Sequence, residues 1–197
     1  MTAAVVGADG VARCPWGAGD GLLAEYHDIE WGRELRGRDA LFERISLEAF
    51  QSGLSWLVVL RKRPAFRAAF AGFDPEAVAR FDEDDVTRLL TDAGIVRNRA
   101  KIEATIANAR AVLGLAERAE DLDTLLWSFA PPPREQPPAG FEDVPATTPA
   151  STAMAGALRS RGFRFVGPTT CYALMQATGM VDDHVAGCFR AVGVPSA

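Results

Sequence analysis

The sequence has few cysteines and histidines and no long hydrophobic segment, and each shortage excludes a class of protein. Only three cysteines and two histidines occur among 197 residues. An odd number of widely spaced cysteines, in a chain without an export signal, does not predict a disulfide framework. Metal binding or simple burial explains them better. The longest apolar stretch, residues 54–60, has the size of a core segment and is too short to span a membrane.

The two ends of the chain are expected to be short tails around one folded unit. Residues 1–12 hold no basic cluster and no sustained apolar stretch. We therefore interpret them as a flexible tail, not a signal peptide, and expect a cytoplasmic protein. Residues 13–190 then form a single domain, followed by a tail at residues 191–197. A hydrophobic fraction of 48% with 24% charged residues is ordinary for such a domain.

The net charge of −5 argues weakly against a nucleic-acid partner, but the charges are unevenly distributed. Acidic residues concentrate at positions 74–92 and 117–123. Residues 151–181 contain no acid, whereas arginines stand at positions 159, 161 and 164. A locally basic face on this acidic protein is therefore compatible with binding DNA.

Hydrophobic periodicity and helix-terminating residues predict an all-α fold. Asp39 is expected to cap one helix, Pro64 to interrupt the next, and Pro75 to open another after Asp74. No segment shows the period-two alternation that is typical of a strand. The predicted helices cover residues 39–51, 55–64, a short segment from 74, 82–94, 97–118, 122–129, 148–161 and 168–179.

Two connections between the predicted helices carry information. Residues 130–149 are rich in proline and predict an extended surface connection. The last two helices are joined by a short hairpin that contains glycine. Backbone N–H groups at the start of the second helix lack helical partners, so they suit a DNA phosphate. An ordinary helical hairpin is the alternative interpretation.

The histidines and two of the cysteines occur as matched pairs. His184 and Cys188 stand four residues apart, and Cys14 and His27 form a second pair near the N-terminus. Together they make the Cys₂His₂ set of a closed, structural zinc site, which would join the two ends of the chain. The alternative is burial of neighbouring cysteines and histidines without metal. Cys171 lies on an apolar helical segment and is expected in the core.

An acidic residue on an apolar helix face is the second candidate for chemistry. Glu48 follows Leu41 and Ile45 on one stripe of its helix. Together with Tyr26, Trp31 and Trp56 it could form a slot for a flat, electron-poor base. A buried ion pair with an arginine, surrounded by core aromatics, is the alternative.

A series of short motifs occurs in one order along the chain: Arg13-Cys14-Pro15-Trp16, Tyr26-His27-Asp28-x-Glu30-Trp31-Gly32, Leu47-Glu48, Gln51-Ser52-Gly53-Leu54-Ser55-Trp56, Asp92-Ala93-Gly94-Ile95, Arg97, Lys101-Ile102, Trp127-Ser128-Phe129, Arg161-Gly162-Phe163-x-Phe165-Val166-Gly167 and Asp183-His184-Val185-x-Gly187-Cys188. Taken together, these motifs resemble the bacterial 3-methyladenine DNA glycosylases of type I. The resemblance extends over residues 13–189, nearly the whole chain.

This resemblance implies a helix-hairpin-helix glycosylase fold and assigns roles to individual residues. It implies structural zinc held by Cys14, His27, His184 and Cys188. It also implies a base pocket made by Tyr26, Glu48 and Trp56. The residues expected at the DNA interface are Gly53 and Leu54, between two helices, and Phe165, Val166, Gly167 and Thr169, in the hairpin.

The implied reaction is the removal of 3-methyladenine from double-stranded alkylated DNA by a monomeric enzyme. A base inside a duplex must be extruded before it can react, and Leu54 could fill the gap that it leaves. A purine methylated at N3 is cationic and already a good leaving group. Tyr26 and Trp56 could stack on it, while Glu48 accepts hydrogen bonds and stabilises the oxocarbenium-like sugar. No lysine stands at an evident nucleophile position, so hydrolysis without lyase activity is expected.

Two positions depart from the pattern of the family. Leu23 stands where the family often has a second pocket tyrosine, so affinity or selectivity for the base can differ. Asp182 replaces an asparagine and stands where the wider superfamily has a catalytic aspartate. We predict either an electrostatic role in catalysis for Asp182 or a helix N-cap.

Two other functions are compatible with parts of the pattern. A zinc-stabilised protein that senses damaged DNA without cutting would keep the zinc residues and the hairpin, but it would lack the pocket acid. A zinc hydrolase would use the metal as its Lewis acid, with three protein ligands and an open position. Four ligands, two of them thiolates, favour a structural site instead.

Overall fold

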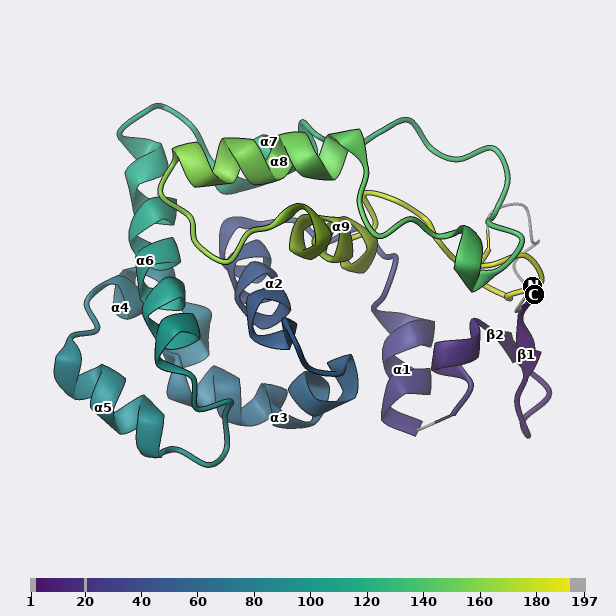
Figure 1. The fold of residues 1–197 in the computed structure, drawn as a ribbon, viewed down its shortest axis with the longest axis horizontal. Coiled ribbons are helices and arrows are strands. Elements are labelled where there is room, and N and C mark those ends of the chain that lie inside the picture. Colours follow the sequence, from purple (N-terminus) through teal and green to yellow (C-terminus); the bar gives the residue numbers. More distant parts are fainter. Residues whose placement is uncertain (1–2, 20, 192–197) are drawn as a thin grey trace.

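The computed structural model describes residues 3–19 and 21–191 and is built almost entirely of helices, as the sequence predicts (Figure 1). The predicted tails fall partly outside the described residues, at positions 1–2 and 192–197. The α-helices are α1 (Gly21–Ile29), α2 (Arg38–Gln51), α3 (Trp56–Ala69), α4 (Pro75–Ala79), α5 (Glu83–Thr91), α6 (Arg99–Ala116), α7 (Leu122–Trp127), α8 (Pro149–Ser160) and α9 (Pro168–Ala177). Short 3₁₀ turns occupy Pro15–Gly17, Ala71–Phe73 and Phe141–Asp143.

Several predicted helix starts are confirmed by their hydrogen bonds. The side chain of Asp74, directly before Pro75, accepts hydrogen bonds from the amides of Glu76 and Ala77. Asp82 and Asp85 form a reciprocal capping box at the start of α5. These residues satisfy amides that the first helical turn leaves without partners, which is why local sequence predicts the starts well.

Two details of the predicted helices are wrong. Helix α2 begins one residue before Asp39, after Gly37 at φ 92°, and Asp39 lies inside its first turn. Helix α3 runs through Pro64 to Ala69. Proline removes one helical hydrogen bond there, but burial of Phe66, which is 0% exposed, stabilises the segment beyond it.

A small strand pair occupies a segment for which the sequence shows no strand pattern. Strands β1 (Val5–Val6) and β2 (Ala12–Arg13) pair antiparallel, with Val5 opposite Arg13. The Phe189 amide donates to the carbonyl of Ala12 at 2.9 Å, so the C-terminal segment lies against this hairpin. Two-residue strands are too short to show alternation in the sequence.

The main core surrounds α2, which packs against α3, α6, α7 and α9 (Figure 1). Aromatic side chains dominate its fully buried part, at positions 42, 50, 66, 70 and 73. A second, smaller cluster lies between α1, the N-terminal hairpin and the C-terminal segment, and includes Cys14, Tyr26, Val185 and Cys188. In the part of the chain that the structure describes, no helix is both long and apolar enough to cross a bilayer.

Candidate active site and metal cluster

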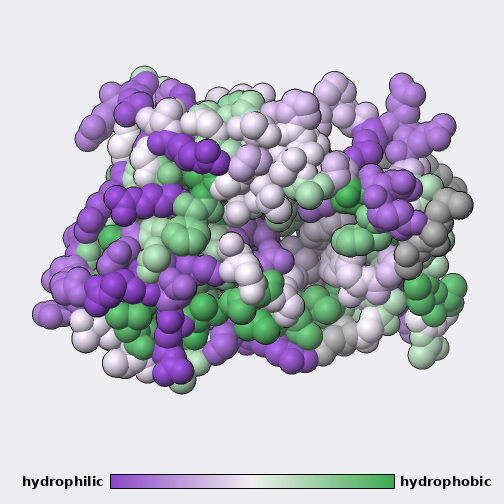
Figure 2. Space-filling model, in the orientation of Figure 1, coloured by the Kyte–Doolittle hydropathy of each residue, from purple (hydrophilic) through white to green (hydrophobic). Residues whose placement is uncertain are grey.

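A cavity of about 180 Å³ lies where α1, the end of α2, the start of α3 and α9 meet. In the space-filling view the surface is hollowed near its middle, in the region between α1 and α9 (Figure 2). The predicted pocket residues Tyr26, Glu48 and Trp56 all line this cavity. The rest of its wall comes from Trp16, Trp31, Gln51, Phe141, Ala173 and Gln176.

Aromatic rings form most of the cavity wall. The ring centres of Tyr26 and Trp56 lie 5.2 Å apart, with their planes at 45°. Trp16 and Trp31 meet edge to face at 5.0 Å. Such ring faces attract a flat cationic ligand through their negative quadrupoles. The cavity therefore suits a planar, positively charged base better than an anion.

Glu48 is the acidic group of the cavity and is only 5% exposed. Burial raises the pKa of its carboxyl group to about 7, and the nearby Arg44 opposes that shift. Arg44 does not form an ion pair with it. Its guanidinium donates to the Tyr26 hydroxyl at 3.0 Å and lies 3.5 Å from Glu30. The carboxylate has no hydrogen-bond partner among residues 3–19 and 21–191, so it is available to a ligand.

A second polar atom of the cavity is also without a partner. The indole Nε1 of Trp56 is buried and donates to no group in the described part of the chain. Buried donors are normally satisfied, so an unpaired one on a cavity wall indicates a ligand acceptor. Leu23, at the position of the expected second tyrosine, packs into the small cluster instead.

The predicted interface residues between α2 and α3 lie at the protein surface. Gly53 has φ 79°, a conformation that suits glycine, and it turns the chain between the two helices. Leu54 is 40% exposed although it is apolar. It lies three residues beyond Gln51, which lines the cavity.

The predicted hairpin contains both exposed and buried residues. Phe165 is 41% exposed and has φ 54°, which is rare for a residue with a side chain. Val166 is only 3% exposed and belongs to the main core, so only its backbone can face DNA. Gly167 caps the start of α9, and Thr169 is exposed in its first turn.

Asn108 holds this hairpin from α6, and the sequence does not reveal it. Its side-chain oxygen accepts from the Arg164 amide at 2.7 Å. Its side-chain nitrogen donates to the Arg164 carbonyl at 3.1 Å. These two hydrogen bonds hold the backbone of Arg164, the residue directly before Phe165 with its left-handed backbone conformation. A lone asparagine on a helix does not indicate such a partner 56 positions away.

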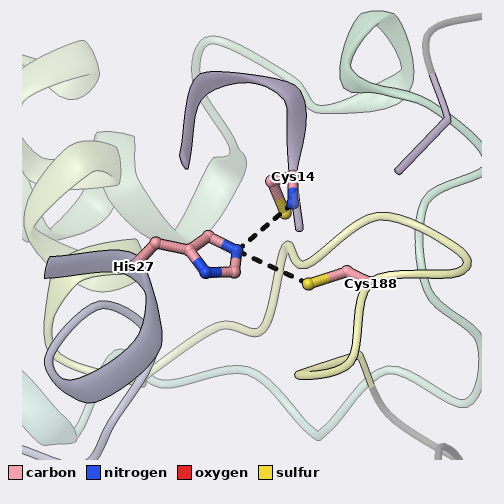
Figure 3. Close-up of side chains that lie close together, drawn as sticks. All are labelled: Cys14, His27 and Cys188. Atoms are coloured by element: carbon pink, nitrogen blue, oxygen red, sulfur yellow. Dashed lines mark hydrogen bonds between the residues drawn. The ribbon is translucent and has the colours of Figure 1, made fainter. Parts of the chain in front are cut away.

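Three of the four predicted metal ligands lie together in the small cluster (Figure 3). The ligand atoms of Cys14, His27 and Cys188 all lie within 4.8 Å of one another. The Nε2 atom of His27 lies 3.4 Å from the Cys188 sulfur, and its Nδ1 lies 2.8 Å from Asp28. A hydrogen bond from Cys14 lowers the pKa of the Cys188 thiol in spite of its burial. This shift favours the thiolate, the form that binds metals.

The fourth predicted ligand lies beside this cluster. The imidazole of His184 has its centre 5.0 Å from that of His27. Its Nδ1 lies 2.9 Å from Asp182, while its Nε2 is buried and has no hydrogen-bond partner within the described ranges. A Cβ atom on Gly32 would come within 2.7 Å of this ring. The ring is thus tightly confined with one nitrogen left over, as expected of a metal ligand.

Asp182 does not cap a helix, which corrects one of the two predicted roles. No helix of the described residues starts after it, and its carboxylate accepts from the backbone amide of His184 at 3.0 Å as well as contacting the imidazole. Because a short turn follows α9 here, the side chain bonds two residues ahead, as aspartate does in turns. Asp182 is absent from the wall of the 180 Å³ cavity.

Several residues of the cavity wall are not predicted from the sequence. Phe141 comes from the proline-rich connection and is 53% exposed. Gln176 comes from α9 and Trp16 from a 3₁₀ turn. The Arg13-Cys14-Pro15-Trp16 motif was a signal for Trp16. Nothing local indicates that Phe141 reaches this cavity, since its placement depends on the path of the whole connection.

Comparison with known proteins places the fold and most of the sequence within one family. The profile of the methyladenine glycosylase family matches residues 16–191. DNA-3-methyladenine glycosylase 1 of Escherichia coli strain K12 is 48% identical over 177 residues, which cover 89% of this chain and 95% of that protein. A crystal structure of 3-methyladenine DNA glycosylase I has a TM-score of 0.87 at 48% identity and covers 90% of this chain and 98% of the other. Another, of a point variant in complex with 3-methyladenine, has a TM-score of 0.81 at 32% identity, covering 89% and 95%.

Proposed function

The chain belongs to the methyladenine glycosylase family, and from this membership we propose how its own residues remove 3-methyladenine from DNA. The enzyme hydrolyses the N-glycosidic bond and leaves an abasic site. It acts as a cytoplasmic monomer on double-stranded alkylated DNA. The observation that carries this proposal is the unpartnered, buried carboxylate of Glu48 in a cavity lined by aromatic rings.

Binding of the flipped base uses the two kinds of group that the cavity offers. Tyr26 and Trp56 stack on the cationic purine, because their ring faces attract positive charge. The carboxylate of Glu48 accepts hydrogen bonds from the amino edge of the base. The free Nε1 of Trp56 donates to a ring nitrogen.

The chemical step needs little proton transfer to the leaving group. Methylation at N3 makes the base cationic, so its bond to the sugar already breaks readily. The ionised form of Glu48 stabilises the oxocarbenium-like sugar while water attacks. Water adds to C1′ of the sugar as the bond to the base breaks, so the products are the free base and an uncut strand with an abasic site.

The duplex is held from two places that flank the cavity. The exposed Leu54 fills the gap left by the extruded base. The hairpin before α9 binds a backbone phosphate through its free amides and Thr169, with Phe165 exposed next to it.

The residues of the small cluster fit a structural zinc ion. Cys14, His27 and Cys188 supply two sulfur donors and one nitrogen donor, and the neighbouring His184 offers its unpaired Nε2 as the fourth. Asp28 and Asp182 lie behind the two imidazoles as orienting carboxylates. We assign Asp182 to orienting His184 and not to catalysis, because it lies outside the cavity wall. Zinc bound here would tie the N-terminal segment to the C-terminal one. Four protein donors leave no open position for a hydrolytic water.

Release of free base from alkylated DNA tests this function. The wild-type enzyme should release 3-methyladenine from methylated duplex DNA, detected by chromatography. The substitution Glu48→Gln should slow single-turnover release about a hundredfold, since it removes the negative charge of the cavity. Glu43→Gln, on the same helix and ion-paired with Arg67, is the control and should keep the rate. Binding of the DNA without release would favour a non-catalytic damage sensor.

A further inference from the structure

A buried polar network connects the proline-rich connection with the cavity. At its centre lies Asp183, which is 2% exposed. Its Oδ2 atom accepts from the Tyr172 hydroxyl at 2.6 Å and from the side-chain nitrogen of Gln176 at 2.8 Å. Its Oδ1 atom lies 2.9 Å from the guanidinium of Arg134. The proposed reaction uses none of these side chains.

This network determines how the amide of Gln176 is oriented. A carboxylate can only accept hydrogen bonds, so the NH₂ end of Gln176 must face Asp183. The Tyr172 hydroxyl donates to the same carboxylate, and the Arg134 guanidinium lies beside it. The amide cannot rotate without placing its oxygen against the negative charge. Its oxygen is therefore the end left for the cavity, whose wall includes Gln176.

We propose that Gln176 is a specificity-determining residue, because Asp183 holds its amide oxygen toward the cavity as a fixed hydrogen-bond acceptor that selects a 6-amino purine over a 6-oxo purine. Adenine carries an amino group at position 6, which donates. Guanine carries a carbonyl oxygen there, which would face the amide oxygen without any proton between them. The cost of an unpaired buried polar group makes such a contact selective.

Glu48 alone does not provide this discrimination. Burial brings its pKa to about 7, so near neutral pH it is partly protonated and can then donate to a carbonyl. The amide oxygen of Gln176 never donates. Glu48 therefore provides the negative charge of the cavity, and Gln176 determines which base is bound.

Binding of the free bases tests this inference, which rests on the proposed function. Three tryptophans line the cavity, so their fluorescence reports occupancy without a label. Free 3-methyladenine and free 3-methylguanine are titrated into the wild-type protein and into Gln176→Met. This substitution keeps the side-chain length and removes both polar atoms. The expected result is a preference for 3-methyladenine in the wild type that falls about tenfold in the variant.

Gln51→Met is the matched control, because Gln51 lines the same cavity but no carboxylate of residues 3–19 or 21–191 is hydrogen-bonded to its amide. It should change the two affinities by the same factor. Asp183→Asn is the second variant. It lets the Gln176 amide rotate and should lower the preference several-fold without removing any group from the cavity wall.

The outcomes separate this inference from the proposed function. An unchanged preference in both Gln176→Met and Asp183→Asn overturns the inference while leaving the glycosylase assignment intact. Failure of the wild-type protein to bind 3-methyladenine at all contradicts the proposed function itself. Should Gln176→Met not fold, as judged by circular dichroism, Asp183→Asn alone decides the question, since Arg134 stays partly exposed and solvated.

Discussion

The carboxyl group of Glu48 illustrates how burial sets the behaviour of one residue. It stands on a helix whose buried positions are mostly apolar, and the buried Arg44 is engaged with Tyr26. A charge in such a place is costly unless a ligand compensates it. The uncompensated carboxylate therefore destabilises the folded protein, and binding of a cationic base relieves this destabilisation.

This cost makes stability depend on pH in a defined direction. The pKa of Glu48 rises from 4.5 to about 7 on folding, so between these values the folded state binds the extra proton. The free energy of unfolding then falls by about 3 kcal/mol in total as the pH rises from about 4.5 to 7, at 1.36 kcal/mol per pKa unit. It is level above pH 7.

Urea unfolding at several pH values measures this dependence. The free energy of unfolding of Glu48→Gln, relative to the wild type, should increase steadily over that interval, because glutamine does not titrate. A difference that stays constant from pH 5 to pH 8 would contradict the assignment. Addition of 3-methyladenine should flatten the wild-type curve.

The sequence alone identified the residues whose own pattern is unusual, and it missed those defined by their partners. Glu48 was found because an acid interrupts an apolar stripe, and Tyr26 and Trp56 belong to recognisable motifs. Asp183 and Gln176 look like an ordinary acid and amide near the end of α9. Their role arises from Arg134, more than forty positions earlier, which no local pattern connects to them.

At the scale of elements, local chemistry predicted where helices begin better than where they continue. The caps at Asp74, Asp82 and Thr148 lie next to the amides that they satisfy. Continuation of α3 through Pro64 depends instead on the tertiary burial of Phe66. The sequence signal for a break was real, but packing outweighed it.

The bridge from α6 to the hairpin leads to a prediction about DNA affinity. Asn108→Leu keeps the volume of the side chain but leaves the Arg164 amide and carbonyl without partners. The hairpin should then lose its fixed shape, and affinity for duplex DNA should fall about tenfold. Affinity for free 3-methyladenine should not change, because the cavity lies elsewhere. Fluorescence anisotropy with labelled DNA and base titration measure the two quantities.

Asn98→Ala controls for a general weakening of α6. Asn98 caps this helix through the Lys101 amide at 3.2 Å, so its loss costs about 1 kcal/mol without touching the hairpin. Equal losses of DNA affinity in both variants would mean that Asn108 acts only through stability.

At the scale of the whole molecule, the small cluster joins segments from the two ends of the sequence. Cys14 and Cys188 are separated by almost the entire chain, yet their sulfurs meet beside His27. Spacing within the pair of His184 and Cys188 predicted two of the candidate ligands, although residues 184–188 form an irregular segment after α9 and not the turn of a helix. The contact between the pairs was predicted because together they make one Cys₂His₂ set, and the family pattern pointed the same way.

Metal removal tests this arrangement. The purified protein should contain one zinc ion per chain by elemental analysis. Cys188→Ser should lose it and melt about 10 °C lower, since a loss of a few kcal/mol shifts a domain of this size by that amount. Cys171→Ala, which removes a buried thiol outside the cluster, should retain the metal. Full zinc content in Cys188→Ser would exclude the proposed site.

Tyr26 and His27 are consecutive residues of α1, and one faces the aromatic cavity while the other faces the cluster. A single peptide unit thus joins the cavity wall to a candidate ligand of the proposed zinc site. With zinc in that site, its loss would leave the main core intact but loosen this wall, and a cell deprived of zinc would become sensitive to methylating agents before the protein disappeared. Nutritional metal limitation and alkylation stress would then reinforce each other.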